Sequence, residues 1–416
     1  MSQGAVQIQK NPSQAPYLVW PVARREFYAS ISLAMLLPVG WGTIIFGWRM
    51  LAVLLVSLGA ATLVHAGLSR FTRRGNVLVH VHTVAGVMTL VALSNPQWPG
   101  WIVACAAALL PAIAWVLGGP GREWVHPSAA LALVMTLGMP AAMAMHNVGE
   151  IRNAELGTVF HDAILARNRL FMGDVRDQHP APLYRWSRSS QLDGDDAMQM
   201  QRPDYIAQQA LDDVSAQLRN AELTADGGLV PAPKTYQQIH EGLDQVLVAQ
   251  LPAMDLVLIG AMPGQVGTVC LLGILAGGLY LSYRTILRFR SALMFLVTFV
   301  LAELLLTLWP ASVHHLGFWG LLSVLDNLGG ELLTLWGYSV LGSDMLFAAV
   351  FLLALPGTEP LTSRGRRAFL VTAGLAAGFL HRWNLPILPA TTILMLLMPA
   401  RGIFDLAFSR RSWLAR

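Results

Sequence analysis

Carboxylates inside apolar runs are the residues whose type and position most directly suggest a chemical role. Glu303 lies within a long apolar run, and Asp344 and Glu359 stand near the two ends of another. A charged side chain at membrane depth is costly, and those that occur usually mark the path of an ion or a proton. Glu303, Asp344 and Glu359 are therefore candidates for an ion path. The alternatives are a bond to a neighbouring helix for Glu303, an interfacial acid for Asp344 and an ion pair for Glu359.

Histidines near apolar runs raise a different chemistry, because paired imidazoles can hold haem b. No two of them are required by the sequence to face each other, so haem b is only an alternative and is not the expected cofactor. Cys105 and Cys270 are the two cysteines and lie far apart, and no CxxC motif occurs. We expect no thiolate metal site. The histidines that the haem alternative would use are His65, His80, His82, His126 and His146.

Glycine and proline cluster where four apolar runs begin or end. The stretches are "LGGPGREWVHPSAALAL", "IGAMPGQVGTVC", "VLGSDMLFAAVFLLALPGTEPLTSRGRR" and "HRWNLPILPA". Glycine lets backbones approach closely, and the start of a helix such as Gly264–Thr268 can hold an anion or a phosphate. The alternative is that these stretches are turns that end membrane spans and glycines that allow close helix packing.

The composition indicates how these residues are positioned. The chain has 416 residues, of which 55% are apolar and 12% charged, and several apolar runs approach the roughly 20 residues that cross a bilayer as a helix. We predict an all-α polytopic membrane protein with about ten transmembrane helices in two inverted five-helix halves. The expected spans are 28–48, 50–68, 78–94, 101–118 and 127–146, followed by 265–283, 291–309, 340–355, 367–383 and 386–400.

Arginines predict the orientation of these spans. They gather at alternate ends of the apolar runs, whereas the links "SNPQWPG" and "WPASVHHLG" carry no arginine or lysine. The positive-inside rule then places both termini in the cytoplasm and residues 147–250 on the other side of a bacterial cytoplasmic membrane, in the periplasm. The lipid bilayer is one expected partner. A basic stripe with interleaved aromatics is missing, so we expect no nucleic-acid binding.

Three regions follow from this reading. Residues 1–146 are a cytoplasmic segment and the first five-helix half, residues 147–250 are a polar exterior insert, and residues 251–416 are the second half. The insert contains two amphipathic helical candidates, 204–223 and 235–251. Within the second half, residues 311–338 are apolar but interrupted by polar and glycine residues, which favours an interfacial or re-entrant helix pair.

The turns that close the third and the eighth expected spans are alike, which suggests an inverted repeat. The third span ends in "VALSNPQWP" and the eighth in "LLALPGTEP", so each apolar run closes with a proline turn. With five spans in each half, these two spans run in opposite directions. Functional sites of inverted repeats tend to lie where the halves meet.

Taken in order, the glycine–proline stretches resemble a known family of membrane proteins, the RnfD/NqrB family. Its members are integral components of the Rnf electron-transport complex and of the sodium-translocating NADH:quinone reductase. The resemblance spans nearly all the expected helices but not the insert. It rests on three stretches, "GGPGREWVHPSAALAL", "MPGQVGTV" and "VLGSDMLFAAVFLLALPGTEPLTSRGR". In the third stretch the matching residues are Gly342, Phe351, Pro356, Pro360, Leu361, Thr362, Gly365 and Arg366.

The resemblance implies a protein that passes electrons through flavins within a multisubunit complex coupled to sodium or proton movement. Its implied partners are other membrane and peripheral subunits and a quinone. No GxGxxG motif follows a strand, so we expect no NADH oxidation by the chain alone. The residues that the resemblance places near a cofactor are Gly119, Gly121, His126, Pro263, Gly264, Gly267, Thr268, Thr358, Thr362, Gly365 and Arg366.

Departures from the family pattern narrow this expectation. The family's covalent FMN sits on a threonine in a segment like "SGAT", which this chain lacks, so any FMN or riboflavin is expected to be non-covalent. Thr268 stands where the family has an acid, and His126 where it has an asparagine. We expect an integral subunit that relays electrons through flavin or supports ion-coupled electron transfer. The alternative is a degenerate, non-catalytic scaffold that docks partners through its exterior insert.

Overall fold

The structure is a computed structural model, and it describes helices in both predicted halves of the chain. The described residues are 24–46, 48–72, 77–96, 98–116, 125–138, 148–150, 199–201, 203–219, 233–249, 251, 254–260, 264–311, 317–382 and 390–413. The helices of the first half are α1 (Arg24–Ile45), α2 (Trp48–Thr72), α3 (Val77–Ala92), α4 (Gly100–Val116) and α5 (Pro127–Gly138).

The second half is also helical but contains shorter pieces. A π-helical turn follows α15 directly, so the eighth predicted span is not a uniform α-helix. The elements are α11 (Met254–Ile259), α12 (Leu271–Tyr283), α13 (Phe289–Ala311), α14 (Gly317–Leu341), α15 (Met345–Phe347), the π-helical η3 (Ala348–Leu352), α16 (Ser363–Arg382), α17 (Ala390–Leu397), the 3-10 turn η4 (Met398–Ala400) and α18 (Arg401–Trp413).

The predicted class, an all-α polytopic membrane protein, is confirmed. In the described part of the chain, four helices are long and apolar enough to cross a membrane, or five if a bent pair counts as one span. Shorter apolar helices accompany them at 81–92, 100–116, 127–138 and 271–283. Length and composition therefore do not establish the predicted count of ten spans.

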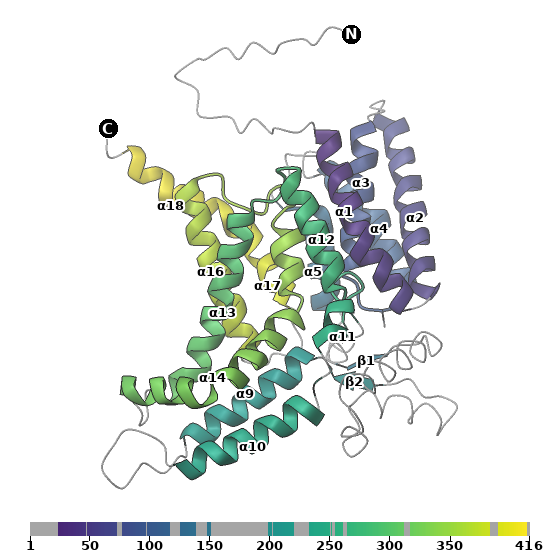
Figure 1. Cartoon of the computed structure of the whole chain (residues 1–416). Helices are drawn as coiled ribbons and strands as arrows, with labels where there is room; N and C mark the ends of the chain where they lie inside the picture. Colours follow the sequence, from purple (N-terminus) through teal and green to yellow (C-terminus); the bar gives the residue numbers. More distant parts are fainter. Residues whose placement is uncertain are drawn as a thin grey trace.

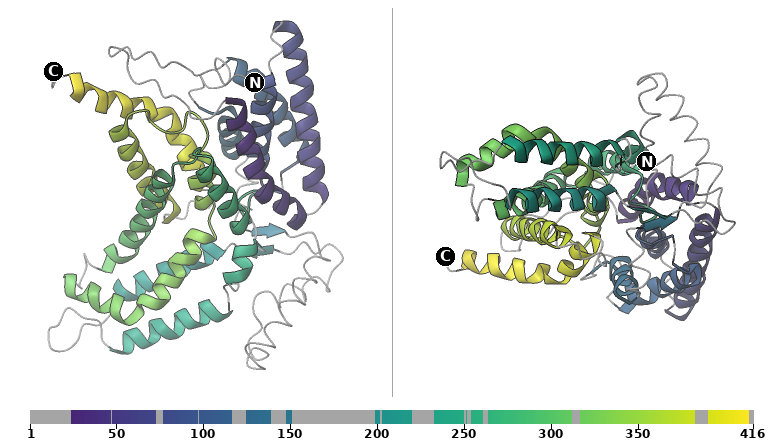
Figure 2. Two further views of the ribbon diagram at one scale, coloured as in Figure 1. Left: turned by 45° about the horizontal axis from the view of Figure 1, so that its top comes forward. Right: turned by 90° about the horizontal axis from the view of Figure 1, so that it is seen from below.

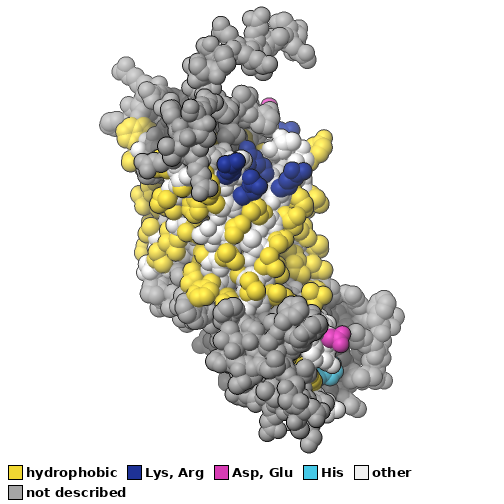
Figure 3. All heavy atoms as spheres, turned by 90° about the vertical axis from the view of Figure 1, so that its left-hand side faces the viewer, with side chains coloured by type: hydrophobic (Ala, Val, Ile, Leu, Met, Phe, Trp, Pro, Cys, Tyr) yellow, Lys and Arg dark blue, Asp and Glu magenta, His cyan; other side chains and the backbone are white. Residues whose placement is uncertain are grey.

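The outer surface of the helices is apolar, as a lipid-facing surface must be. Leu305, Ile403 and Leu406 are more than half exposed. Figure 3 shows a yellow apolar belt on this face, with arginine or lysine side chains at one end and an acid and a histidine at the other. This distribution agrees with a bilayer around the belt and with the positive-inside orientation that the sequence predicts.

Helices of each half pack mainly with one another. In the first half α1 packs on α3 and α2 on α4, and in the second half α13 packs on α16 (Figure 1). The halves also touch each other, because α12 lies against α1 and α17 lies against α5. The inverted relation between the halves stays a prediction.

The described residues of the insert form two short strands and two helices. β1 (Val148–Glu150) pairs antiparallel with β2 (Gln199–Gln201). α9 (Pro203–Arg219) and α10 (Pro233–Ala249) stand where the sequence predicts amphipathic helices. α9 packs against α13 and α14 and buries the predicted apolar face, and Figure 2 shows α9 beside α14. The insert helices therefore cap the second half.

The segment 311–338 differs from the expected helix pair. It contains the last residue of α13 and most of α14, which is one continuous helix of 25 residues. The polar interruption does not break α14, because Asp326 and Asn327 are exposed and the amide of Asn327 donates to the Ser323 carbonyl one turn earlier. The bend comes later: residues 323–341 meet Met345–Leu352 at 60°, as in a broken span or a re-entrant loop.

Candidate functional site

The "MPGQVGTV" stretch joins the two halves. The Val266 amide donates to the Ser94 carbonyl over 3.1 Å, and the Gly267 amide donates to the Ala92 carbonyl over 2.9 Å. Ala92 is the last residue of α3, so the turn that closes the third span meets the turn that precedes α12. A Cβ on residue 267 would lie 2.5 Å from the Ala92 Cβ. Only glycine permits this approach.

The stretch Gly264–Thr268, where an anion could bind, has three amides with protein acceptors. The amides of Val266 and Gly267 are bonded to the first half, and the Thr268 amide donates to the Gln265 carbonyl. The Thr268 hydroxyl donates to the same carbonyl. α12 begins later, at Leu271, behind the capping Cys270. Because these amides already have protein acceptors, the stretch holds the halves together.

The hinge, residues 353–362, is a compact and largely buried turn. Gly357 has φ of +86°, a conformation that favours glycine. The buried Thr358 hydroxyl donates to the carbonyls of Leu353 and Leu355, at 3.2 and 2.9 Å. The turn is therefore held by its own polar groups as well as by its contacts with other helices.

Asp405 of α18 fastens the other end of the hinge. Its carboxylate accepts from the Leu361 amide at 3.0 Å, from the Thr362 amide at 2.8 Å and from the Thr362 hydroxyl at 2.9 Å. A Cβ on Gly365 would collide with the Thr362 hydroxyl and lie 3.0 Å from the Phe404 carbonyl. Gly365 thus lets α18 approach the start of α16, and the carboxylate contact fixes the end of the turn.

Glu359 forms an ion pair inside the hinge. Its carboxylate lies 3.2 Å from Arg366 Nε and 3.8 Å from Arg288 Nη1. Burial raises the pKa of the Glu359 carboxyl above its ordinary value, and Arg366, Ser291 and Arg288 oppose that shift. The sequence left open an ion pair for Glu359, and the structure places Arg366 in that role. Glu359 therefore has a structural partner at the arginine-rich end of the bundle.

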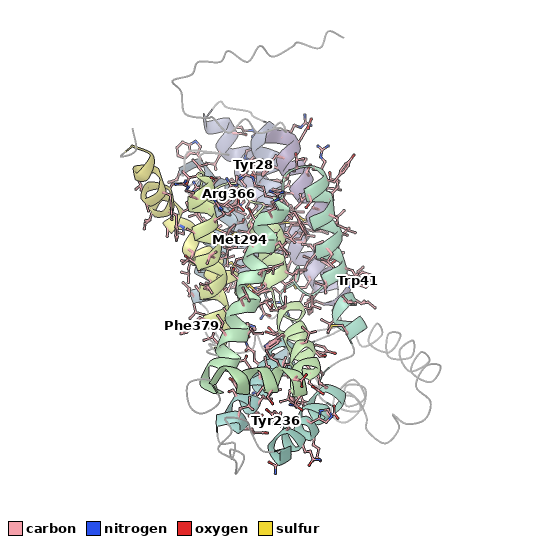
Figure 4. The ribbon with its side chains drawn as sticks, turned by 60° about the vertical axis from the view of Figure 1, so that its left-hand side comes forward. Tyr28, Trp41, Tyr236, Met294, Arg366 and Phe379 are labelled. Atoms are coloured by element: carbon pink, nitrogen blue, oxygen red, sulfur yellow. The ribbon has the colours of Figure 1, made fainter. Side chains whose placement is uncertain are left out.

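A cavity of about 140 Å³ opens beside this pair. Thr358, Glu359 and Arg366 line it together with Arg288 and Arg401. Figure 4 places Arg366 at the end of the bundle opposite Tyr236 of the insert. Sites that bury a ligand of drug size usually span about 300–1,000 Å³. The described residues can therefore enclose a phosphate or a ring edge here, but they do not enclose a whole flavin.

Glu303 belongs to a second polar cluster, at the insert end. The His381 Nδ1 lies 2.7 Å from Glu303 Oε1, and His381 Nε2 lies 3.5 Å from Asp204 Oδ2. The Gln208 amide nitrogen lies against Nδ1 and donates to the His381 carbonyl at 2.7 Å. The imidazole thus stands between a carboxylate of α13 and a carboxylate of α9.

Small residues bring the two membrane helices of this cluster together. A Cβ on Gly378 would lie 2.6 Å from the Ala302 Cβ and 3.0 Å from the Phe299 carbonyl. Gly374, one turn earlier, touches Thr298 and Phe295 in the same way. Small residues four apart allow close helix contact in membranes. This contact brings His381, at the end of α16, next to Glu303.

Asp344, the third ion-path candidate, has a capping role. Its Oδ2 accepts from the Thr391 amide at 2.9 Å and from the Thr391 hydroxyl at 2.6 Å. Thr391 lies in the first turn of α17, where a negative charge is favourable. Asp344 is only 1% exposed, so this bond ties α17 to the bend before α15.

Two of the histidines meet inside the first half. The rings of His82 and His126 lie 5.2 Å apart, and Tyr28 contacts His82 edge-on. The His126 Nδ1 lies 2.6 Å from the Ser128 hydroxyl. His65 is buried on α2. The described residues hold no group of three or more His, Cys, Asp or Glu arranged for a metal ion, and the haem alternative stays a prediction.

Several predicted site residues lie outside the described residues. They are Gly119, Gly121, Pro263 and His146, and the side chain of His80 belongs with them. Among the others, the structure groups Thr358, Thr362, Gly365 and Arg366 at the hinge and places Gly264, Gly267 and Thr268 at the junction of the halves.

Sequence reasoning missed three partners. Asp204 and Gln208 read only as polar positions of an amphipathic helix, and Asp405 as part of a basic tail. A faint signal exists for Asp204, which lies in the first turn of its helix. For His381, the sequence signal is that it begins the stretch "HRWNLPILPA", one of the four stretches in which glycine and proline cluster. Their roles depend on contacts between segments far apart in the chain.

Apolar helices with a lipid-facing belt, joined by two motif-bearing turns, define an integral membrane protein of the polytopic helical class. A family model, described as the NQR2, RnfD, RnfE family, matches residues 12–400. The chain belongs to this family, as the resemblance of its motifs predicted. A search of curated proteins found no match. The family consists of membrane subunits of Rnf and NQR complexes, and membership in it is consistent with a component of a redox complex.

Proposed function

We propose that this chain supports ion-coupled electron transfer as an integral subunit of an Rnf- or NQR-like complex in the bacterial cytoplasmic membrane. The observation that carries the proposal is the family match over residues 12–400. The junction of the halves supports it, because Gly267, which lies in a family-like turn, contacts Ala92 of the other half. Its expected partners are further membrane and peripheral subunits, with a quinone as a candidate acceptor.

The hinge supplies a candidate contact with those partners at the arginine-rich end. Arg288, Arg366 and Arg401 converge on the cavity, and Glu359 is the one acid among the described residues that line it. Such a cavity favours an anionic group of a partner or a cofactor. A whole non-covalent flavin would need more enclosure than the residues lining this cavity give.

The position of the insert helices on the second half favours a second candidate function, a membrane scaffold. A scaffold subunit would need no flavin of its own and would hold electron-carrying partners in place. In that case the insert helices α9 and α10 would meet the partner, and loss of partners after changes in the insert would leave any chromophore unchanged.

Purification with native partners tests the proposal. The tagged full chain is extracted in mild detergent, its companions are identified by mass spectrometry, and absorption spectra are recorded oxidised and reduced. We expect redox-active subunits in the preparation. Flavin released by acid precipitation would be non-covalent, flavin on the pellet would be covalent, and a Soret band would support the haem alternative.

Two results would separate the remaining readings. A colourless chain that keeps its redox partners would favour the scaffold. A chain that purifies without redox partners, and whose deletion leaves electron transfer in membrane vesicles unchanged, would refute the proposed function.

A further inference from the structure

The Glu303 carboxylate has one satisfied oxygen and one that lacks a partner. Oε1 lies 2.7 Å from His381 Nδ1, whereas Oε2 is buried and has no hydrogen-bond partner among the described residues. The side chain is only 1% exposed. A buried ionised oxygen without a donor is unfavourable, and a proton on that oxygen would remove the charge.

The second carboxylate comes from the insert. Asp204 is buried and lies in the first turn of α9, where the helix dipole favours its ionised form. Its Oδ2 lies 3.5 Å from His381 Nε2. The imidazole therefore faces one acid with each nitrogen, and the Phe299 ring packs on it edge-on at 5.5 Å.

Glu303 is the acid of this cluster whose charge the described residues compensate least. In the described part of the chain its carboxylate pairs with His381 and with no arginine or lysine, and Oε2 has no hydrogen-bond partner there. Because uncompensated charge is costly at membrane depth, these contacts favour a proton on Glu303.

We propose that Glu303, His381 and Asp204 form a proton-binding site, with Glu303 Oε2 taking up the exchangeable proton. Asp204 stays ionised at its helix start, His381 lies between the two acids, and Glu303 alternates between carboxylate and carboxylic acid. The Gln208 amide nitrogen lies against His381 Nδ1 and donates to the His381 carbonyl. The binding of a proton does not depend on the proposed function, whereas its use during turnover does.

A proton suits this geometry better than a metal cation. A hard cation needs several oxygen ligands around one point, but here an imidazole occupies the space between the two carboxylates. The part of the chain that the structure describes holds no cluster of His, Cys, Asp or Glu suited to a metal ion. Imidazole can instead donate through either nitrogen and pass a proton between its neighbours.

The two carboxylates of the site come from different parts of the protein. Glu303 belongs to α13, inside the apolar belt, and Asp204 belongs to α9, in the capping insert. Residues 303 and 381 are 78 positions apart, and residues 208 and 381 are 173 apart. His381 thus connects the interior of the second half with the insert, which is the direction a proton would take between the membrane interior and the insert side.

Infrared difference spectroscopy of the purified full chain, titrated with pH, tests the site. We expect a carbonyl band of a buried carboxylic acid that disappears as the pH rises. Glu303→Gln should remove this band entirely. Asp204→Asn and His381→Gln should shift its titration midpoint. Glu241→Gln, on the exposed face of α10, is the matched control and should leave the band unchanged.

Several outcomes overturn the proposal. They are a wild-type protein without a titrating band, a band that persists in Glu303→Gln, or a midpoint that neither Asp204→Asn nor His381→Gln moves. If Glu303→Gln does not fold, the wild-type band and the other two variants still decide. The bands need no flavin and no partner, so a chain that shows the band but purifies without redox partners would refute the proposed function and leave the proton site standing.

Discussion

The close contact between Gly267 and Ala92 predicts a measurable loss of folding stability when Gly267 is replaced by alanine. In Gly267→Ala the new methyl would lie 2.5 Å from the Ala92 Cβ and 2.9 Å from its Cα, whereas ordinary contact begins at 3.4 Å. The two turns must therefore separate by about 0.9 Å or store the strain. Their backbone bonds, at 2.9 and 3.1 Å, would then exceed hydrogen-bonding length.

The cost follows from these bonds. Two backbone hydrogen bonds contribute about 1 kcal/mol each, and overpacking adds about 1–3 kcal/mol where the turns do not separate. The lower conformational entropy of the unfolded variant offsets about 0.4–1 kcal/mol. We expect a net loss of about 1.4 kcal/mol, or roughly a 10-fold change in the unfolding equilibrium.

Reversible unfolding in detergent micelles, followed by tryptophan fluorescence, measures this loss. The matched control is Gly59→Ala in α2, where an added Cβ meets nothing within 4 Å, and it should be neutral or slightly stabilising. Ala92→Gly removes the nearer contact atom, so the double variant should recover part of the loss in a double-mutant cycle. A Gly267→Ala protein as stable as the wild type would refute the close approach.

Further expectations concern the hinge and the insert. Asp405→Asn removes a charged acceptor and should speed hydrogen exchange at the hinge about 10-fold, for a loss of about 1.4 kcal/mol, while the lipid-facing Ile403→Ala should not. His240→Ala removes the 2.9 Å contact with Glu331 and should loosen α10 by about 0.5 kcal/mol, measured as faster exchange of its amides. Burial raises the pKa of Glu359 above 4.5, so its stabilising contribution is present at low pH and lost as pH rises through the raised pKa. Glu359→Gln removes this loss, so the unfolding midpoint of the variant should rise relative to that of the wild type as pH rises through this range.

Each expectation has a contradicting result. Unchanged exchange at residues 361 and 362 in Asp405→Asn would show that α18 does not fasten the hinge. Unchanged exchange across α10 in His240→Ala would leave the Tyr236–Ser323 hydrogen bond, at 3.0 Å, as the docking contact that matters. An unfolding midpoint of Glu359→Gln that falls relative to that of the wild type as pH rises would mean that the Arg366 pair outweighs burial.

The sequence by itself determined the local structure and the family. Continuous apolar runs predict membrane helices because backbone groups in lipid must bond within the segment. The insert helices were predicted from apolar spacing, which places Ile206, Leu211 and Val214 on one buried face. The motifs around Gly267 and Gly365 predicted the family, since glycine permits and proline fixes particular backbone conformations wherever they occur.

Tertiary structure alone decided which polar groups meet. Glu303 was recognisable as an unusual acid, but its partner His381 lies 78 positions away, and Gln208, which holds His381, lies 173 positions from it. Likewise, the sequence left open an anion site or a packing role for Gly264–Thr268, and only the structure shows which carbonyls accept from the amides of residues 266–268. Periodicity specifies which face of a helix is buried, whereas the neighbour on that face depends on the packing of the whole bundle.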